Sequence, residues 1–193
     1  MTESQFFDRK SARLAPKDFS HQLSGFANAS GGIVVLGIED NGDVTGVTPD
    51  QENAFRQTAF DFLQIPPEYQ VEIVSCVLTS GGNGRIMLFH IAPSANEIIK
   101  LKNGEAYLRV GDSSRKLTAE MLAALEYSKG IKSYESRIVD DANMDDLDSN
   151  LIHEYTELLG TTASSSFDLL KGRGLIKEKD GQIKITVAAI LLF

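Results

Sequence analysis

The sequence predicts an α+β fold with a mixed, largely antiparallel sheet and flanking helices, followed by a small C-terminal segment with a winged-helix outline. Three observations predict this class. A strand pattern follows a helix-length segment near the N-terminus, two strand-like runs flank the glycine-rich turn at 80–84, and a helix, helix and hairpin pattern occupies 151–193. The length of 193 residues is enough for one medium domain and a small one.

The predicted fold depends on the apolar, β-branched run at 33–38. Its composition and length are typical of a strand buried on both faces. Small and glycine residues precede the run, where the helix expected at 16–29 must end and the chain must reverse. The acidic turn at 39–43 follows it, so Asp40 is expected where a core strand reaches the surface.

Capping residues, helical spacing and turn signals predict the other elements of the N-terminal part. Pro16 and Asp18 suit the first turn of a helix, and apolar residues then recur on one helical face. In chain order we expect a strand or irregular lead-in at 4–10, helices at 16–29 and 51–63, a short returning strand at 44–47, hairpins of 71–79 with 85–91 and of 98–101 with 106–110, and a helix at 119–129.

The C-terminal part has a different pattern. Helices at 151–159 and 164–171 and a hairpin at 177–185 follow one another in the order of a winged helix. The apolar stretch at 187–193 has no polar end, which predicts that the protein continues beyond it. The expected division is a domain at 1–130, an aspartate-rich acidic linker at 131–150, and the small winged-helix-like segment at 151–193.

Composition limits the function classes. The net charge of −8 disfavours tight, non-specific binding to phosphate backbones, which Lys and Arg drive. The single cysteine, Cys76, excludes an intrachain disulfide and a cysteine-built zinc site. No apolar run approaches the roughly 20 residues that span a bilayer, so no membrane partner is expected. No signal peptide is visible at the N-terminus, and a cytoplasmic location is therefore expected.

Several spaced motifs occur in the order of a known family. They are the segment GFANASGGIVVLGIEDNGDVTGV, the two predicted hairpins and the segment AYLRVGDSSRKLTAEML. Over residues 3–130 the chain resembles the Schlafen-type AlbA domain. The resemblance implies a nucleic-acid-binding domain of bacterial transcriptional regulators and helicase-related proteins. It also implies a further C-terminal domain as a partner, because residues 138–193 look like the segment that precedes an ATPase-like domain in longer members.

The resemblance further implies a carboxylate site. The family's opening motif, close to Glu-Ser-x-x-x-Glu-x-Lys, is matched from Glu3 to Lys10, with Asp8 in place of the second Glu. In Schlafens that cleave RNA, an Asp at the end of the central strand completes the site, and Asp40 matches it. Glu3, Asp8 and Asp40 are therefore candidate catalytic residues and ligands of Mg²⁺ or Mn²⁺. From the residues alone, solvated carboxylates are the favoured interpretation, with Asp40 serving the turn.

A second candidate site consists of basic side chains suited to phosphate. Its members are Arg9, Lys10, Arg13, Arg109, Arg115 and Lys116. Arg109 has an alternative role as the ion-pair partner of an acid in the core turn. The loop at 111–114 lacks a P-loop pattern, so no nucleotide site is expected there. We expect Asn28 to have a structural role in the turn that follows the first helix.

Three functions remain open from the sequence. The leading one is a DNA-binding transcriptional regulator with DNA or RNA as partner and no cofactor, which requires the basic side chains on one face. The second is a nuclease dependent on Mg²⁺ or Mn²⁺, which requires the three carboxylates to converge. The third is a protein-interaction or oligomerisation module, including a homodimer, which fits the acidic balance and requires an exposed apolar patch, expected to involve 187–193.

Overall fold

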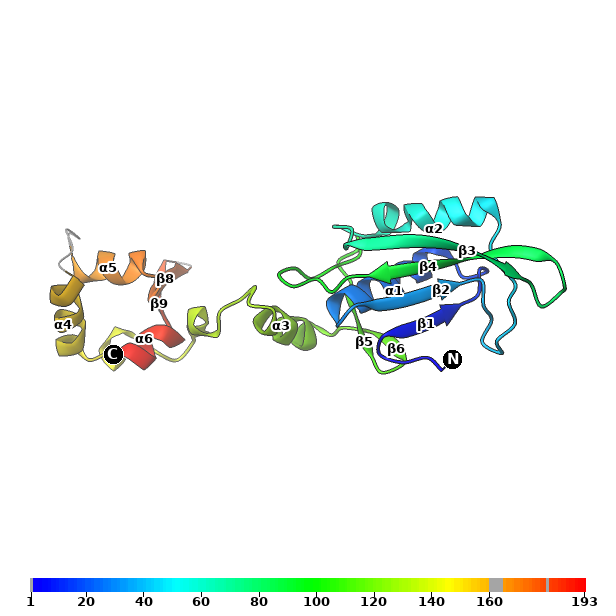
Figure 1. Ribbon diagram of the computed structural model, residues 1–193. Helices are drawn as coiled ribbons and strands as arrows, with labels where there is room; N and C mark the ends of the chain where they lie inside the picture. Colours follow the sequence, from blue (N-terminus) through cyan, green and yellow to red (C-terminus); the bar gives the residue numbers. More distant parts are fainter. Residues whose placement is uncertain (1, 160–164, 180) are drawn as a thin grey trace. The chain divides into compact units, whose positions relative to one another are not determined.

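The computed structural model describes residues 2–159, 165–179 and 181–193 (Figure 1). The chain forms two compact units, Met1–Lys129 and Gly130–Phe193. The predicted α+β class with a mixed, mostly antiparallel sheet is confirmed. Within the described ranges, no helix has the length and apolar character needed to cross a bilayer.

The first unit is built on a four-stranded sheet in the order β1-β2-β4-β3. Strand β1 is parallel to β2, and the other neighbouring pairs are antiparallel. Strands β5 and β6 form a separate hairpin. The elements are β1 (Phe7–Lys10), α1 (Pro16–Asn28), β2 (Gly32–Leu36), α2 (Pro49–Phe62), β3 (Tyr69–Val77), β4 (Asn83–Ile91), β5 (Tyr107–Val110), β6 (Ser113–Lys116) and α3 (Ala119–Ser128).

Helices α1 and α2 pack against one face of this sheet. Phe19 of α1 contacts Phe55 of α2 and Phe89 of β4, with ring centroids 5.3 and 4.7 Å apart and edge-to-face geometry. The spacing that predicted one apolar face of α1 is confirmed, since Phe19, Leu23 and Phe26 are all fully buried. This aromatic contact connects both helices to the sheet.

The side chain of Asn28 ties the end of α1 to the segment before β5. Its Nδ2 donates to the carbonyl oxygens of Ile99 and Tyr107, both at 2.9 Å, and its Oδ1 accepts from the Ile99 N–H at 2.8 Å. Asn28 is 2% exposed, so its two bonds to Ile99 lie away from bulk water, whereas its bond to Tyr107 is partly buried. The structural role expected of Asn28 thus extends beyond the turn to a contact with a distant segment.

The predicted hairpin of 98–101 with 106–110 is present only in part: the chain reverses at 102–105, where the Leu101 N–H donates to the Glu105 carbonyl at 2.7 Å. A single isolated bridge joins Lys100 to Ala106, and β5 pairs with β6 across a tight turn at Gly111. The φ of 64° at Gly111 is the left-handed conformation that such a reversal needs, and glycine adopts it without strain. The returning strand expected at 44–47 is likewise reduced to one isolated bridge.

The second unit combines helices with a three-stranded antiparallel sheet in the order β7-β9-β8. The predicted helix pair and hairpin are present, although Ser164 and Asp180 lie outside the described residues. The stretch expected to be a linker contributes buried Leu147 to this unit's core. The elements are η1 (Tyr134–Ser136), β7 (Ile138–Val139), η2 (Met144–Asp146), α4 (Ser149–Leu159), α5 (Ser166–Gly172), β8 (Ile176–Lys179), β9 (Gln182–Thr186) and α6 (Val187–Leu192).

Replacing Asn28 with alanine should lower the free energy of unfolding of the first unit by about 3 kcal/mol, because buried backbone groups at Ile99 and Tyr107 lose their partner. Urea unfolding, with hydrogen exchange of peptides covering 98–107, measures this loss locally. Asn53→Ala, on the exposed side of α2, is the matched control and should change stability by at most about 0.5 kcal/mol. Equal stability of the two variants would contradict the role of Asn28.

Candidate functional site

Strand β1 places Asp8 inside the first unit. Parallel pairing puts Asp8 beside Val34 and Lys10 beside Leu36. Val34 and Leu36 are fully buried in the core, and side chains beside each other across neighbouring strands lie on the same face of a sheet. Asp8 is accordingly fully buried, whereas Arg9 lies on the opposite face.

Both carboxylate oxygens of Asp8 are occupied by cations. Arg109 Nη1 lies 2.8 Å from Oδ2, and Lys10 Nζ lies 2.7 Å from Oδ1. The side chain of Arg109 is only 1% exposed. These are charge-assisted hydrogen bonds, and Asp8–Arg109 is a buried ion pair that is kept stable because each charge has a partner.

The other donors of Arg109 bind the backbone at the N-terminus. Nε and Nη2 donate to the Ser4 carbonyl at 3.2 and 2.9 Å, and Nη2 also donates to the Phe7 carbonyl at 3.3 Å. The guanidinium lies over the ring of Phe26, 4.7 Å from its centroid. Arg109 therefore has the ion-pair role that the sequence left open, with Asp8 of β1 rather than with an acid of the core turn. It does not lie on a phosphate-binding surface.

Glu3 lies beside this pair at the sheet edge. Its Oε1 is 3.9 Å from both Arg9 Nε and Lys10 Nζ, and its side chain is 28% exposed. Burial, and then the nearby charge of Asp8, raise the pKa of Glu3 above its ordinary value, while Lys10 opposes the rise. The two acids of the opening motif are thus neighbours, as the family resemblance implied.

Asp40 does not join them in a metal site. It is exposed in the turn after β2, where its backbone carbonyl accepts a 2.8 Å hydrogen bond from Arg9 Nη2. Among the residues that the structure describes, no group of three His, Cys, Asp or Glu side chains could hold a metal ion. The predicted set of Glu3, Asp8 and Asp40 therefore does not fit Mg²⁺ or Mn²⁺. The physical reason is that cations already occupy both oxygens of Asp8.

The remaining predicted basic residues lie on the surface, and two of them are paired with acids. Arg13 Nη2 is 2.8 Å from a Glu39 carboxylate oxygen, and this hydrogen bond lowers the pKa of Glu39. Lys116 is paired with Glu105. Arg115 is exposed on β6. Exposed pairs stabilise a fold little, but they weaken the positive potential that a phosphate would meet. The six predicted residues do not form one uncompensated basic face.

Sequence reasoning missed Gln5, which anchors the N-terminus to the β5–β6 turn. Its Nε2 donates to the Arg109 carbonyl at 2.9 Å, and its Oε1 accepts from the Gly111 N–H at 2.8 Å. These residues are more than 100 positions apart in the chain. Neither periodicity nor a local motif carries a signal for such a contact, so only the folded chain reveals it.

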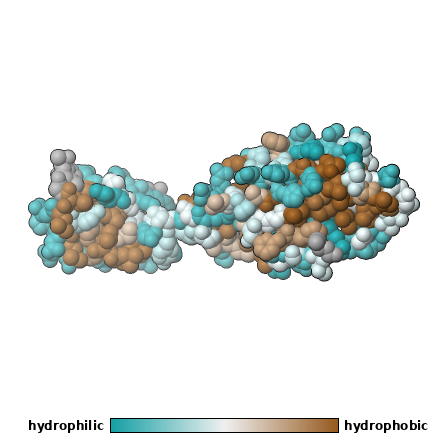
Figure 2. Space-filling view, in the orientation of Figure 1, coloured by the Kyte–Doolittle hydropathy of each residue, from teal (hydrophilic) through white to brown (hydrophobic). Residues whose placement is uncertain are grey.

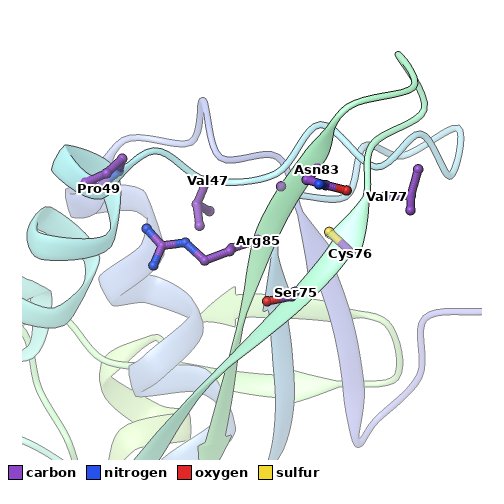
Figure 3. Close-up of a pocket in the computed structure, with 8 residues that line it drawn as sticks. Val47, Pro49, Ser75, Cys76, Val77, Asn83 and Arg85 are labelled. Atoms are coloured by element: carbon purple, nitrogen blue, oxygen red, sulfur yellow. The ribbon is translucent and has the colours of Figure 1, made fainter.

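A surface groove of about 700 Å³ lies elsewhere, at the turn end of the β3–β4 hairpin (Figure 3). Figure 3 shows Arg85 extending toward Pro49 at the start of α2. Arg85 is the one charged side chain among the described residues that line the groove, and it pairs with Glu52 at 2.9 Å. The lining residues are Val47, Pro49, Ser75, Cys76, Val77, Asn83, Gly84 and Arg85. The groove therefore contains none of the predicted site residues.

Comparisons with known proteins give a family and a structural neighbour for this chain. A family model described as Schlafen, AlbA_2 matches residues 3–118, which is more than half of the chain. The comparison with curated proteins found no match. Among solved structures, the chain is similar to the DIP2311 protein from Corynebacterium diphtheriae, with a TM-score of 0.50 and 20% identity. That alignment covers 98% of this chain and 40% of the other, so the chain spans less than half of that protein and the likeness supports the fold alone.

Replacing Arg109 with methionine should lower the free energy of unfolding by about 3–5 kcal/mol, because Asp8 loses its buried partner. Adding Asp8→Asn should cost less than the two single changes summed, since the pair acts as a unit. Urea unfolding of the four proteins of this cycle measures both effects. Arg115→Met, on the exposed β6, is the control and should stay within about 0.5 kcal/mol of the parent. Strictly additive losses would show that the two side chains are not coupled.

Proposed function

The chain belongs to the Schlafen AlbA_2 family, and on this premise we propose that it binds DNA, with its C-terminal unit as the main contact. Transcription regulation is the proposed role, because sequence-selective binding of duplex DNA is what a helix-turn-helix unit provides. In this proposal the first unit makes fewer contacts with DNA than the second. Most of its predicted phosphate-binding side chains already pair with acids of the same unit.

The observation that carries the proposal is the order of elements in the second unit. Helices α4 and α5 precede the β8–β9 hairpin, and β7 extends the sheet beside β9. We interpret this order as a winged helix. In helix-turn-helix proteins the second helix of the pair lies in the major groove, which assigns that position to α5. Ser165 caps α5, since its hydroxyl accepts from the Asp168 N–H.

Local charge supports the C-terminal part of the same unit, although residues 130–193 as a whole carry seven Lys and Arg against eleven Asp and Glu. Residues 165–193 carry five Lys and Arg against three Asp and Glu, whereas the preceding 164 residues carry 14 against 24. Arg173 and Lys179 are exposed after α5 and on the hairpin, where they would meet phosphates. The basic residues of this segment are Lys171, Arg173, Lys177, Lys179 and Lys184. A local excess of positive charge can bind DNA even in a protein whose net charge is −8.

The nuclease alternative is not part of the proposal. A metal-dependent nuclease needs carboxylate oxygens that are free to bind the ion and a water. Asp8 has both oxygens bound to Lys10 and Arg109 in the interior, and Asp40 lies in an exposed turn. We therefore assign the acids of the opening motif a structural role and derive no hydrolytic step from them.

The double variant Arg173→Ala/Lys179→Ala should weaken binding to a labelled DNA duplex at least about tenfold. It should also reduce the slope of log K against log salt by about 2, because two phosphate contacts are removed. Fluorescence anisotropy at several salt concentrations measures both quantities. The control is Arg56→Ala, which removes one exposed cation from α2 of the first unit. It should leave the slope of log K against log salt unchanged.

Duplex DNA, single-stranded DNA and RNA should be compared with and without Mn²⁺, followed by a gel for product size. A larger effect from Arg115→Ala than from the double variant would move the interface to the first unit. Cleavage that Asp40→Ala abolishes would replace the proposal with the nuclease. Absence of binding at low salt would overturn the proposal for this chain.

A further inference from the structure

One face of the four-stranded sheet has no helix or strand packed on it within the described part of the first unit. Helices α1 and α2 cover the opposite face, and in Figure 1 nothing lies in front of β1, β2, β4 and β3. Figure 2 shows apolar residues gathered over this sheet. Alternation along the strands identifies the apolar side chains of the open face. They are Phe7, Ile33, Val35, Val74, Ile86 and Leu88, of which Val35 is only 5% exposed.

The strand register places opposite charges at the two edges of this face. Arg9 pairs with Val35, Val35 with Leu88, and Leu88 with Glu72, so the four form one row across the sheet. The row therefore begins with a cation on β1, continues with two apolar side chains and ends with an anion on β3. An apolar centre with polar edges is the usual anatomy of a protein interface.

Both charged residues keep part of their side chains accessible. Arg9 is 24% exposed and donates from Nη2 to the Asp40 carbonyl beyond the end of the strand. Glu72 is 57% exposed and lies 3.2 Å from His90 Nε2. A row with one cation and one anion at opposite edges does not favour binding of a polyanion such as DNA. It does favour binding of a surface that carries the same row of charges in reverse order.

We propose that this sheet face is the interface of a homodimer, with a second copy of the chain as its occupant. A two-fold axis that runs along the strands, between β2 and β4, turns the row end for end. Arg9 of each copy then faces Glu72 of the other, and the two apolar centres pack together about 10 Å apart. The row of side chains is complementary in charge to its own reversed copy. A second copy of the chain therefore fits this face better than an unrelated protein. The proposal is independent of DNA binding.

The decisive test compares two valines of the same strand. Val74→Lys places a charge beside the apolar centre, on the edge strand β3 next to Glu72, and should raise the dimer dissociation constant at least about tenfold. Val77→Lys, on the opposite side of β3 and already 69% exposed, should leave it unchanged. Sedimentation velocity of the full chain over a concentration series measures the dissociation constant. Circular dichroism melting confirms that both variants stay folded.

A charge exchange tests the two-fold arrangement itself. Arg9→Glu and Glu72→Arg should each weaken the dimer at least about tenfold through like-charge contacts, and the double variant should regain most of the lost affinity. A chain that sediments as a monomer at every concentration would overturn the proposal. A dimer that persists in Val74→Lys would also overturn it, because the subunits would then meet elsewhere.

Discussion

The buried ion pair between Asp8 and Arg109 is the interaction on which the arrangement of the first unit depends. It joins β1 to β5 across 101 positions of sequence. A charge in the interior is tolerated only with a partner. Movement of either strand would therefore leave the charge on the other strand unpaired in an apolar environment. The remaining donors of Arg109 bind the carbonyls of Ser4 and Phe7, which also fixes the path of the N-terminus.

This pair changes how the family's motifs are interpreted in this chain. Asp8 and Lys10 of the opening motif are distant in sequence from Arg109 of β5. The three side chains nevertheless form one charge cluster. A carboxylate that already accepts from two cations has little to offer a metal ion. The same compensation recurs at the surface, where Arg13 and Lys116 pair with acids. The cations of the first unit thus hold its own acids, which limits what they can offer a phosphate.

Local chemistry predicted the elements whose signals lie within a few residues. The helix expected at 119–129 is found as α3, capped by Thr118. The helix expected at 51–63 begins earlier, at Pro49, because Thr48 and Gln51 form a capping box. The β5–β6 hairpin was missed because the chain reverses twice in succession, at 102–105 and at Gly111, and propensity alone does not show which reversal is flanked by the longer ladder. Gln5 accepts a hydrogen bond from the Gly111 N–H, a long-range contact that local patterns do not encode. For the same reason the sequence placed Asp8 near its acidic neighbour Glu3 but could not show that a distant arginine neutralises it.

The two proposals combine into one account of an acidic protein that binds DNA. Dimerisation through the sheet of the first unit would provide two copies of the second unit in one particle. DNA-binding dimers use such duplication to contact two half-sites, and the second contact forms at a high effective concentration. A few exposed cations per copy, such as Arg173 and Lys179, then suffice for useful affinity, because the number of released counterions doubles with the number of bound units. Under the two proposals, the open sheet face and the local excess of basic residues at 165–193 would have complementary roles, since the first would raise the number of contacts and the second would supply each one.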